Sequence, residues 1–154
     1  MNAAHTVLPD HSVDCHFSMT VLEHIPPEVI RDIFTEAKRI LVRGGAAIHF
    51  VDMSDHFQHQ DSAITRINFL KFSETEWKRI AGNEFAYCNR LRASDLLKLF
   101  GELGYAIERQ ETDLDAESMK ALKGGKIVVN QAFATYDPDD MCSISLKVQL
   151  GLHQ

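Results

Sequence analysis

Residues 8–25 read LPDHSVDCHFSMTVLEHI, and this stretch decides which fold the chain can form. Apolar and polar side chains alternate over residues 13–17, which predicts a β-strand with one buried face. The polar residues Ser18, Glu23 and His24 follow the end of this strand. In an open α/β sheet, ligands bind just beyond the carboxyl ends of the strands. The residues after position 17 are therefore the first place to look for a functional site.

A helix and a second strand follow this stretch. Residues 27–41 place apolar side chains at helical spacing, with Pro27 suited to the first turn and Glu28 to the positive end of the helix dipole. We expect the glycine pair at 44–45 to stop the helix. Residues 46–51, AAIHFV, are nearly continuously apolar, as expected for a strand covered on both faces.

The rest of the chain continues to alternate helices and strands. Residues 73–76 form a capping box that opens a short helix, and a second helix begins at 93 or 94 and stops at Gly104. Strands are predicted over 105–110 and 143–150, with a helix over 115–122 between them. The last strand follows closely on a turn, so an antiparallel orientation is open to it. This order implies an α/β fold, with helices packed on the faces of a sheet.

Size and composition exclude several classes of protein. The 154 residues suit one domain, and 45% hydrophobic with 25% charged residues is ordinary for a globular chain. A net charge of -6 gives no attraction to nucleic acid or to an anionic membrane. Three scattered cysteines indicate reduced thiols, and no apolar run approaches the roughly 20 residues that span a bilayer. We predict a cytoplasmic protein without nucleic-acid or membrane partners.

Two blocks in order carry a resemblance to a known family. Residues 8–25 resemble the fourth-strand motif of class I S-adenosylmethionine-dependent methyltransferases (type 11-like), in which an L-P-x-x-x-x-D segment leads into the strand and V-L-E-H follows it. Residues 37–45, AKRILVRGG, resemble the helix and glycine turn before the fifth strand of that family. Residues 103–105 resemble its turn into the sixth strand. The resemblance covers most of the chain.

The resemblance implies a partial doubly wound, Rossmann-like sheet holding the fourth to seventh strands of the family. The twelve residues before the first strand contain no glycine, so the family's glycine-rich cofactor loop is missing from this sequence. We therefore expect residues 1–154 to form a single methyltransferase-like domain truncated at its N-terminal side, with residues 53–92 as a loop and helical insertion. The first strand would then have a bare edge, which favours a homo-oligomer or a complementing chain.

By the same resemblance, the cofactor is S-adenosyl-L-methionine and the acceptor is a small molecule or glycan precursor. Ser18 and Met19 match family positions that line the cofactor, and Asn2 and Ala3 match positions near the adenine. Because the glycine-rich loop is missing, we expect the chain alone to lack the main cofactor contact. His24 is a candidate to orient or deprotonate the acceptor, since its unperturbed pKa lies near neutrality. The alternative is a histidine that hydrogen-bonds locally at the start of its own helix.

Residues 52–61 hold the densest group of ligand-type side chains, at Asp52, Asp55, His56, His59 and Asp61. Such groups suit a metal, a substrate or a solvated loop, but their spacing matches no defined metal site. We predict no metal, a catalytic role for His56, and substrate contacts for Asp55 and His59.

Two arginines and two further histidines each have a functional and a structural interpretation. Arg90 and Arg92 could clamp an anionic acceptor or form ion pairs with nearby acids, and we predict substrate contact for both. His16 and His49 lie within the predicted strands, where a hydrogen-bonded core histidine is the simpler interpretation. The rival to an enzyme is a non-catalytic remnant or interaction subunit that pairs with another chain through its exposed sheet edge.

Overall fold

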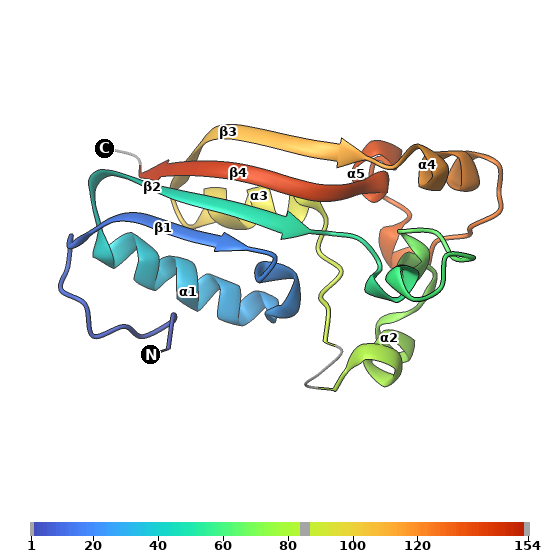
Figure 1. Ribbon diagram of the computed structural model, residues 1–154, viewed down its shortest axis with the longest axis horizontal. Helices are drawn as coiled ribbons and strands as arrows, with labels where there is room; N and C mark the ends of the chain where they lie inside the picture. Colours follow the sequence, from blue (N-terminus) through green and yellow to red (C-terminus); the bar gives the residue numbers. More distant parts are fainter. Residues whose placement is uncertain (1, 84–86, 153–154) are drawn as a thin grey trace.

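In the computed structural model, residues 2–83 and 87–152 are described, and they form an α/β fold built on one open sheet (Figure 1). The strands are β1 (Val13–Met19), β2 (Leu41–Asp52), β3 (Tyr105–Leu114) and β4 (Ser143–Leu152), in the spatial order β1-β2-β4-β3. β1 and β2 are parallel, whereas β4 runs antiparallel to both β2 and β3. The predicted α/β class and the antiparallel last strand are both confirmed.

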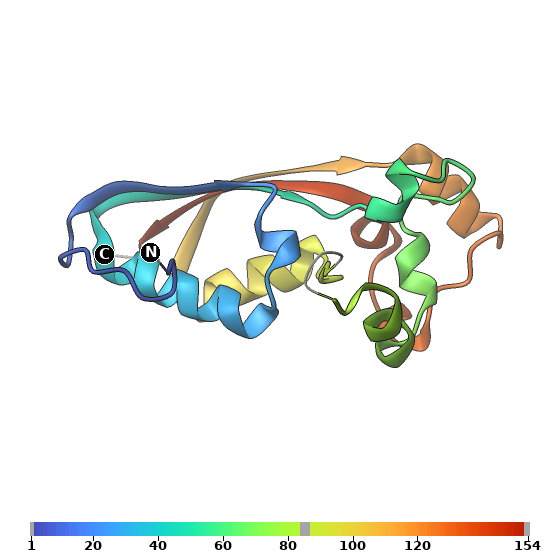
Figure 2. The same ribbon diagram turned by 60° about the horizontal axis from the view of Figure 1, so that its bottom comes forward.

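Among the described residues, helices cover one face of this sheet. α1 (Pro27–Ile40) and α3 (Ala93–Glu102) lie on the same side, and Figure 2 shows no helix over the opposite face. The other helices gather at the far end of the molecule: α2 (Glu74–Ala81), α4 (Ala116–Lys123) and α5 (Pro138–Cys142), with the short 3-10 helices η2 (His56–His59), η3 (Asn68–Lys71) and η4 (Gln131–Phe133). A further 3-10 helix, η1 (Leu22–His24), directly follows β1.

The main core lies between the sheet and the helices α1 and α3. Phe34 of α1 is fully buried at its centre, with ring centroids 4.6 Å from Phe100 and 4.8 Å from His49. Burying one large apolar side chain contributes about 1.5–3 kcal/mol, so this layer holds α1 and α3 to the sheet. The amphipathic pattern predicted for residues 27–41 places Ile30, Ile33 and Ile40 on the same buried stripe.

A second core fills the opposite end of the molecule. It joins the segment 67–88 to residues 121–142, so the predicted insertion packs against the region between β3 and β4. Trp77 of α2 is 6% exposed and its indole nitrogen donates to the carbonyl of Cys88 at 2.8 Å. The predicted capping box of Ser73 and Glu76 is confirmed.

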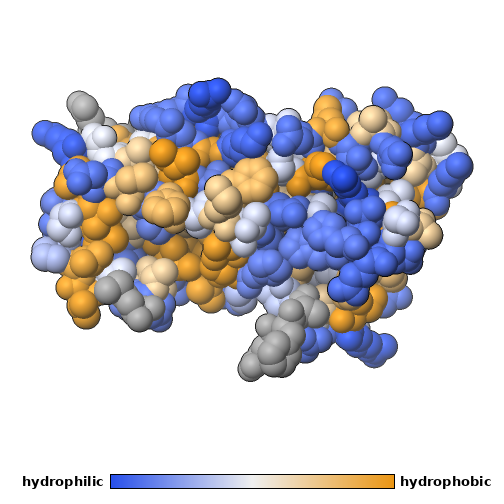
Figure 3. All heavy atoms as spheres, in the orientation of Figure 1, coloured by the Kyte–Doolittle hydropathy of each residue, from blue (hydrophilic) through white to orange (hydrophobic). Residues whose placement is uncertain are grey.

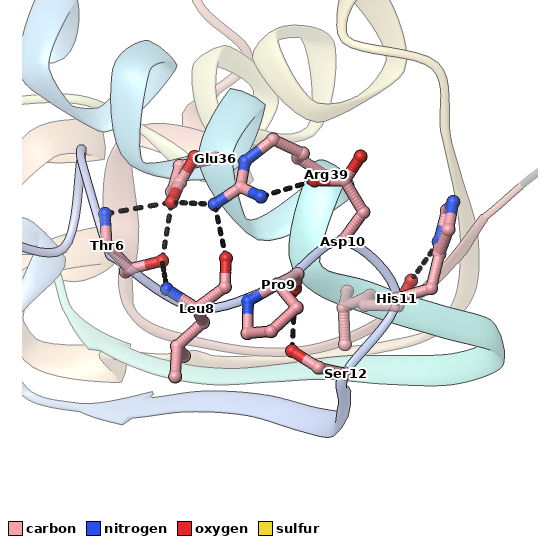
Figure 4. Close-up of polar contacts among 9 residues, drawn as sticks. Thr6, Leu8, Pro9, Asp10, His11, Ser12, Glu36 and Arg39 are labelled. Atoms are coloured by element: carbon pink, nitrogen blue, oxygen red, sulfur yellow. Dashed lines mark hydrogen bonds and ion pairs between the residues drawn. The ribbon is translucent and has the colours of Figure 1, made fainter.

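The N-terminal segment is fastened to α1 by a polar network (Figure 4). The backbone amide of Thr6 donates to Glu36, and the Arg39 guanidinium donates to Glu36 and to the carbonyl of Leu8. These contacts, Arg39 first and then Thr6, lower the pKa of Glu36 to about 2. The network fixes the segment before β1 relative to α1.

Two local predictions about β2 are wrong. α1 ends at Ile40 and β2 starts at Leu41, so the pair Gly44 and Gly45 lies inside the strand and does not stop the helix. Gly44 has a φ of +79°, and a Cβ at Gly45 would stand 2.9 Å from the carbonyl oxygen of Asp14, so these glycines permit an irregular, close approach to β1. Nor is β2 covered on both faces, because Ile48 is 46% exposed on the face without helices.

Candidate functional site

The site is built where two parallel strands end side by side. β1 and β2 pair in register up to Met19 and Phe50, so the turns that follow them meet at one edge of the sheet. Thr20 begins the turn after β1 with a φ of +50°, an unusual conformation for a β-branched residue. Its amide donates to the carbonyl of Phe50 at 2.9 Å. This strained turn carries the chain directly into η1.

Three ligand-type side chains converge at this edge. Atoms of Glu23, His24 and His56 all lie within 4.8 Å of one another, and the two imidazole centroids are 5.0 Å apart. His24 Nδ1 stands 2.9 Å from the carbonyl oxygen of Tyr87. A carbonyl only accepts, so Nδ1 carries the proton and Nε2 keeps a lone pair in the neutral ring. We call these three residues the Glu-His-His group.

Glu23 is the unusual member of the group. It is 2% exposed, and neither of its carboxylate oxygens has a hydrogen-bond partner within residues 2–83 and 87–152. Burial raises the pKa of Glu23, against the opposing effects of its backbone amide and the two histidines. Its backbone carbonyl accepts from the amide of Asn89 at 2.8 Å, and the Asn89 side chain donates to the carbonyls at 22 and 25. Segment 87–90 therefore holds the whole turn in place.

Asp52, at the end of β2, sets the electrostatics of His56. Burial opposes ionisation of Asp52, but His56 and Ser54 lower its pKa to about 2. His56 Nε2 lies 3.6 Å from an Asp52 oxygen, and this contact raises the pKa of His56. The Asp52 carboxylate therefore stays ionised at neutral pH beside an imidazole. Both residues lie close enough to Glu23 to affect the pKa of its carboxyl group.

The predicted loop residues divide between the site and the scaffold. His59 is exposed and stacks on His56, with centroids 5.5 Å apart and planes 19° from parallel. Asp55 is 1% exposed and accepts from the amide of Phe57, so it caps η2. Burial raises the pKa of Asp55. Asp55 therefore stabilises the backbone of the loop that carries His56.

The two arginines lie away from this group. Arg90 is 8% exposed and donates to the carbonyls of Phe69 and Phe72 and to Glu74. Arg92 is fully buried, over the ring of Phe69, and its side chain donates to backbone carbonyls at positions 53, 91, 141 and 143. Such contacts hold the two cores together. The substrate contact predicted for both residues stays a prediction, and Arg90 also lines a cavity beside Tyr87.

The predicted cofactor residues occupy two places. Ser18 and Met19 line a depression of about 500 Å³ on the helix-free face of the sheet, together with Phe17 and Ile48. Figure 3 shows apolar side chains gathered over this part of the sheet. Asn2 accepts from the amide at position 4, and Ala3 lines a different hollow, beside His16 and α1. The structure therefore does not bring Asn2 and Ala3 together with Ser18 and Met19.

Sequence reasoning assigned no role to Glu23. The available signal was its position, directly before His24 in the turn after the first strand. His16 and His49 were taken as core histidines, and His49 is 1% exposed with its Nδ1 2.7 Å from Ser18 Oγ. His16 is half-buried, and its Nδ1 has no hydrogen-bond partner in the described part of the chain. The expectation of a hydrogen-bonded core residue is therefore confirmed for His49 only.

Comparisons with known proteins agree with this geometry. Residues 1–49 match the family model of a methyltransferase domain, and this span contains β1, α1 and most of β2. A search of curated proteins gives no match. A methyltransferase from Methanosarcina mazei, described as SAM-dependent, is 13% identical with a TM-score of 0.61, over 100% of this chain and 66% of that one.

Two further solved structures have the same fold. Geranyl diphosphate C-methyltransferase from Streptomyces coelicolor is 12% identical with a TM-score of 0.56, over 99% of this chain and 52% of that one. An S-adenosylmethionine-dependent methyltransferase from Mesorhizobium loti is 13% identical with a TM-score of 0.57, over 97% and 66%. The chain thus spans about half to two thirds of these proteins. It has the class I S-adenosylmethionine-dependent methyltransferase fold that its sequence motifs predict.

One further finding concerns membranes. Within the described residues, no helix combines the length and the apolar character needed to cross a bilayer.

Proposed function

We propose that this chain supplies the acceptor side, and with Ser18 and Met19 part of the donor side, of an S-adenosylmethionine-dependent methyltransferase acting on a small molecule. The observation that carries the proposal is the convergence of Glu23, His24 and His56 at the carboxyl ends of two parallel strands. Ligands of open α/β sheets bind at this edge. The match of residues 1–49 to a methyltransferase domain supports the same reaction class.

Methyl transfer is an in-line displacement that needs an oriented acceptor and, where the acceptor carries a proton, a base. S-adenosylmethionine would supply the electrophilic methyl group, held beside Ser18 and Met19. His24 is oriented for the second task, because Nδ1 is engaged by the Tyr87 carbonyl and Nε2 is free to accept a proton. His56, placed by Asp52, would hydrogen-bond the acceptor.

A cavity behind the turn fits the acceptor. Its volume is about 480 Å³, and its lining includes Pro26, Trp77, Tyr87 and Arg90. Tyr87 links it to the site, because the Tyr87 carbonyl also holds His24. Small-molecule sites are about 300–1,000 Å³ and mostly apolar with a few polar groups. A polar small molecule such as a glycan precursor, with its reacting atom near His24 and His56, suits both features.

Calorimetric titration with S-adenosylhomocysteine tests the donor side without turnover. We expect saturable binding to the folded chain, weakened about tenfold or more by a charge at Met19 in Met19→Lys. Ile107→Lys is the matched control, because Ile107 is 40% exposed on β3, at the opposite edge of the sheet. A folded sample that shows no binding, or equal binding by both variants, would contradict the proposal for this chain alone.

A second function, as an interaction subunit, is favoured by the exposed face. Phe17 is 75% exposed and Met19 is 71% exposed, and β1 pairs with β2 on one side only in the described structure. Exposed apolar patches and free strand edges favour association with a partner or a second copy. Light scattering with size-exclusion chromatography tests this: wild type should self-associate and Phe17→Asp should be monomeric. A monomeric wild type at high concentration would argue against self-association.

A further inference from the structure

The Glu-His-His group contains two side chains with buried polar atoms that make no hydrogen bond, although His56 Nε2 lies 3.6 Å from Asp52. Both oxygens of Glu23 and Nε2 of His56 are buried and make no hydrogen bond with any described residue. A buried carboxylate without a donor is costly, so native structures normally pair it or bind it to a cation. Two imidazoles, of His24 and His56, lie beside this carboxyl group, and imidazole is a ligand type for transition metals. A buried carboxyl group without a partner, facing two imidazoles, has the composition of a metal site.

The spacing of these atoms is compatible with one ion. Three ligands of one ion with metal bonds of about 2.1 Å stand about 3.4–3.6 Å apart. The atoms of Glu23, His24 and His56 already lie within 4.8 Å of one another, so binding requires a closure of up to about 1.4 Å. Rotation of the side chains supplies a shift of this size, because His24 is exposed at the surface.

The hydrogen bond to Tyr87 orients the His24 ring in the way that metal-bound histidines require. Metal-bound histidines usually donate their second ring nitrogen to a carboxylate or backbone carbonyl, which fixes the tautomer. The Nδ1 of His24 makes this contact with the carbonyl of Tyr87 at 2.9 Å. The Asn89 bonds to the carbonyls at 22 and 25 hold the turn that presents Glu23 and His24. This support exists before any ion binds.

We propose that Glu23, His24 and His56 bind one divalent transition-metal ion of the zinc type. Two imidazoles and one carboxylate suit zinc or iron, whereas Mg²⁺ and Ca²⁺ prefer oxygen ligands alone. Asp52, whose carboxylate lies 3.6 Å from His56 Nε2, adds negative charge beside the site and can serve as a further ligand. The exposure of His24 leaves a coordination position open toward solvent.

The neighbouring ligand-type residues of the loop are outside this set. Asp55 is committed to the amide of Phe57, and His59 stacks on the outer side of His56. From the sequence alone, residues 52–61 predict substrate contacts and no metal. The proposed site instead takes one residue from that loop and two from the turn after β1.

The role of the ion in catalysis rests on the proposed function. A metal with an open position binds an acceptor hydroxyl and lowers its pKa, so that the oxygen attacks as an alkoxide after its proton passes to water. The oxygen then forms a bond to the methyl carbon while the bond from that carbon to the sulfonium sulfur breaks. In the metal-bound protein, His24 and His56 are ligands and no longer act directly on the acceptor.

Cobalt and zinc titrations of the chelator-treated chain test metal binding directly. We expect one ion per chain and a cobalt absorption spectrum of a site with nitrogen and oxygen ligands. His56→Gln and Glu23→Gln should each weaken binding by on the order of 100-fold. His59→Gln is the matched control and should bind as wild type does, because His59 is not a ligand.

Thermal unfolding shows whether a variant is folded. Glu23→Gln removes the buried carboxyl group and keeps its size, so the metal-free variant should melt at or above the wild-type temperature and gain nothing from zinc. Wild type should gain stability from zinc in proportion to its affinity. Binding that is weaker than millimolar in a folded sample would overturn the proposal. Equal binding by His56→Gln and His59→Gln would also overturn it.

The test separates this proposal from the methyltransferase function. Titration with S-adenosylhomocysteine is carried out on the metal-free wild type and on His56→Gln, whose donor side at Ser18 and Met19 is unchanged. Donor binding without metal binding would refute the proposed metal site but not the proposed function. Metal binding without donor binding would refute the proposed function alone.

Discussion

The burial of His49 predicts a specific loss of stability in acid. His49 lies in the middle of β2, 1% exposed, with Nδ1 2.7 Å from Ser18 Oγ and its ring against Phe34 and His16. Burial first, and then the nearby His16, lower the pKa of His49 to about 3. In the unfolded chain its pKa returns to about 6.5. The folded protein therefore holds this imidazole neutral across most of the acid range.

The sign and size of the effect follow from proton linkage. Between the two pKa values the unfolded chain binds a proton that the folded chain rejects, so stability falls as the pH falls. The stabilisation is fully present above about pH 6.5, and about 2 kcal/mol of it is lost at about pH 5. Each further pH unit removes about 1.4 kcal/mol until about pH 3. His16, whose pKa is also lowered by burial, adds to the loss in wild type.

Urea unfolding of wild type and His49→Gln, at neutral pH and in mild acid, isolates the contribution of His49. Glutamine keeps a group that can hydrogen-bond Ser18 but does not titrate. We expect the free energy of unfolding to fall by about 2 kcal/mol more in wild type than in the variant at about pH 5. Equal acid sensitivity of the two proteins would refute the reasoning. So would an NMR titration of the folded protein in which His49 ionises near its ordinary pKa.

Three further predictions concern stability, each measured by urea unfolding. Arg92→Leu should destabilise the fold by about 3–5 kcal/mol, because buried carbonyls lose their donor. Arg31→Leu breaks an exposed ion pair and should cost under about 1 kcal/mol. Equal effects of the two substitutions would contradict this prediction. Thr20→Asn should stabilise by about 0.5–1 kcal/mol, since asparagine tolerates a positive φ, and a loss would show that the turn is unstrained. Gly45→Ala should destabilise by about 1–3 kcal/mol, because its Cβ would meet backbone at 2.9 Å; an unchanged midpoint would show that the strand yields.

Elements with a strong local signal were predictable from the sequence. The capping box at Ser73 opens α2 as expected, and the apolar stripe of residues 27–41 is the buried face of α1. Both depend on contacts within one turn or one face. The predicted end of α1 was wrong because Leu41 continues the helical apolar period. Only its pairing with β1 shows that Leu41 belongs to a strand and not to the helix.

The site was predictable in part. Parallel strands place their following turns together, so His24 and His56 could be assigned to one edge from the strand order alone. The burial of Glu23 could not, because it depends on segment 87–90, which is distant in sequence and closes over the turn through Asn89. The solvent-free position of Arg92 also depends on long-range contacts, since its acceptors lie at positions 53, 141 and 143.

Arg92 and Glu23 show how differently one fold treats two buried charges. Arg92 is surrounded by carbonyl acceptors and the ring of Phe69, so its cost of burial is offset within the chain. Glu23 has no donor in the described structure, and the strained Thr20 lies three residues before it. A fold that satisfies one buried ion in full can retain an unsatisfied one where function requires it. The unsatisfied group is a carboxyl beside two imidazoles at a ligand-binding edge, and the proposed metal ion would complete it from outside the chain.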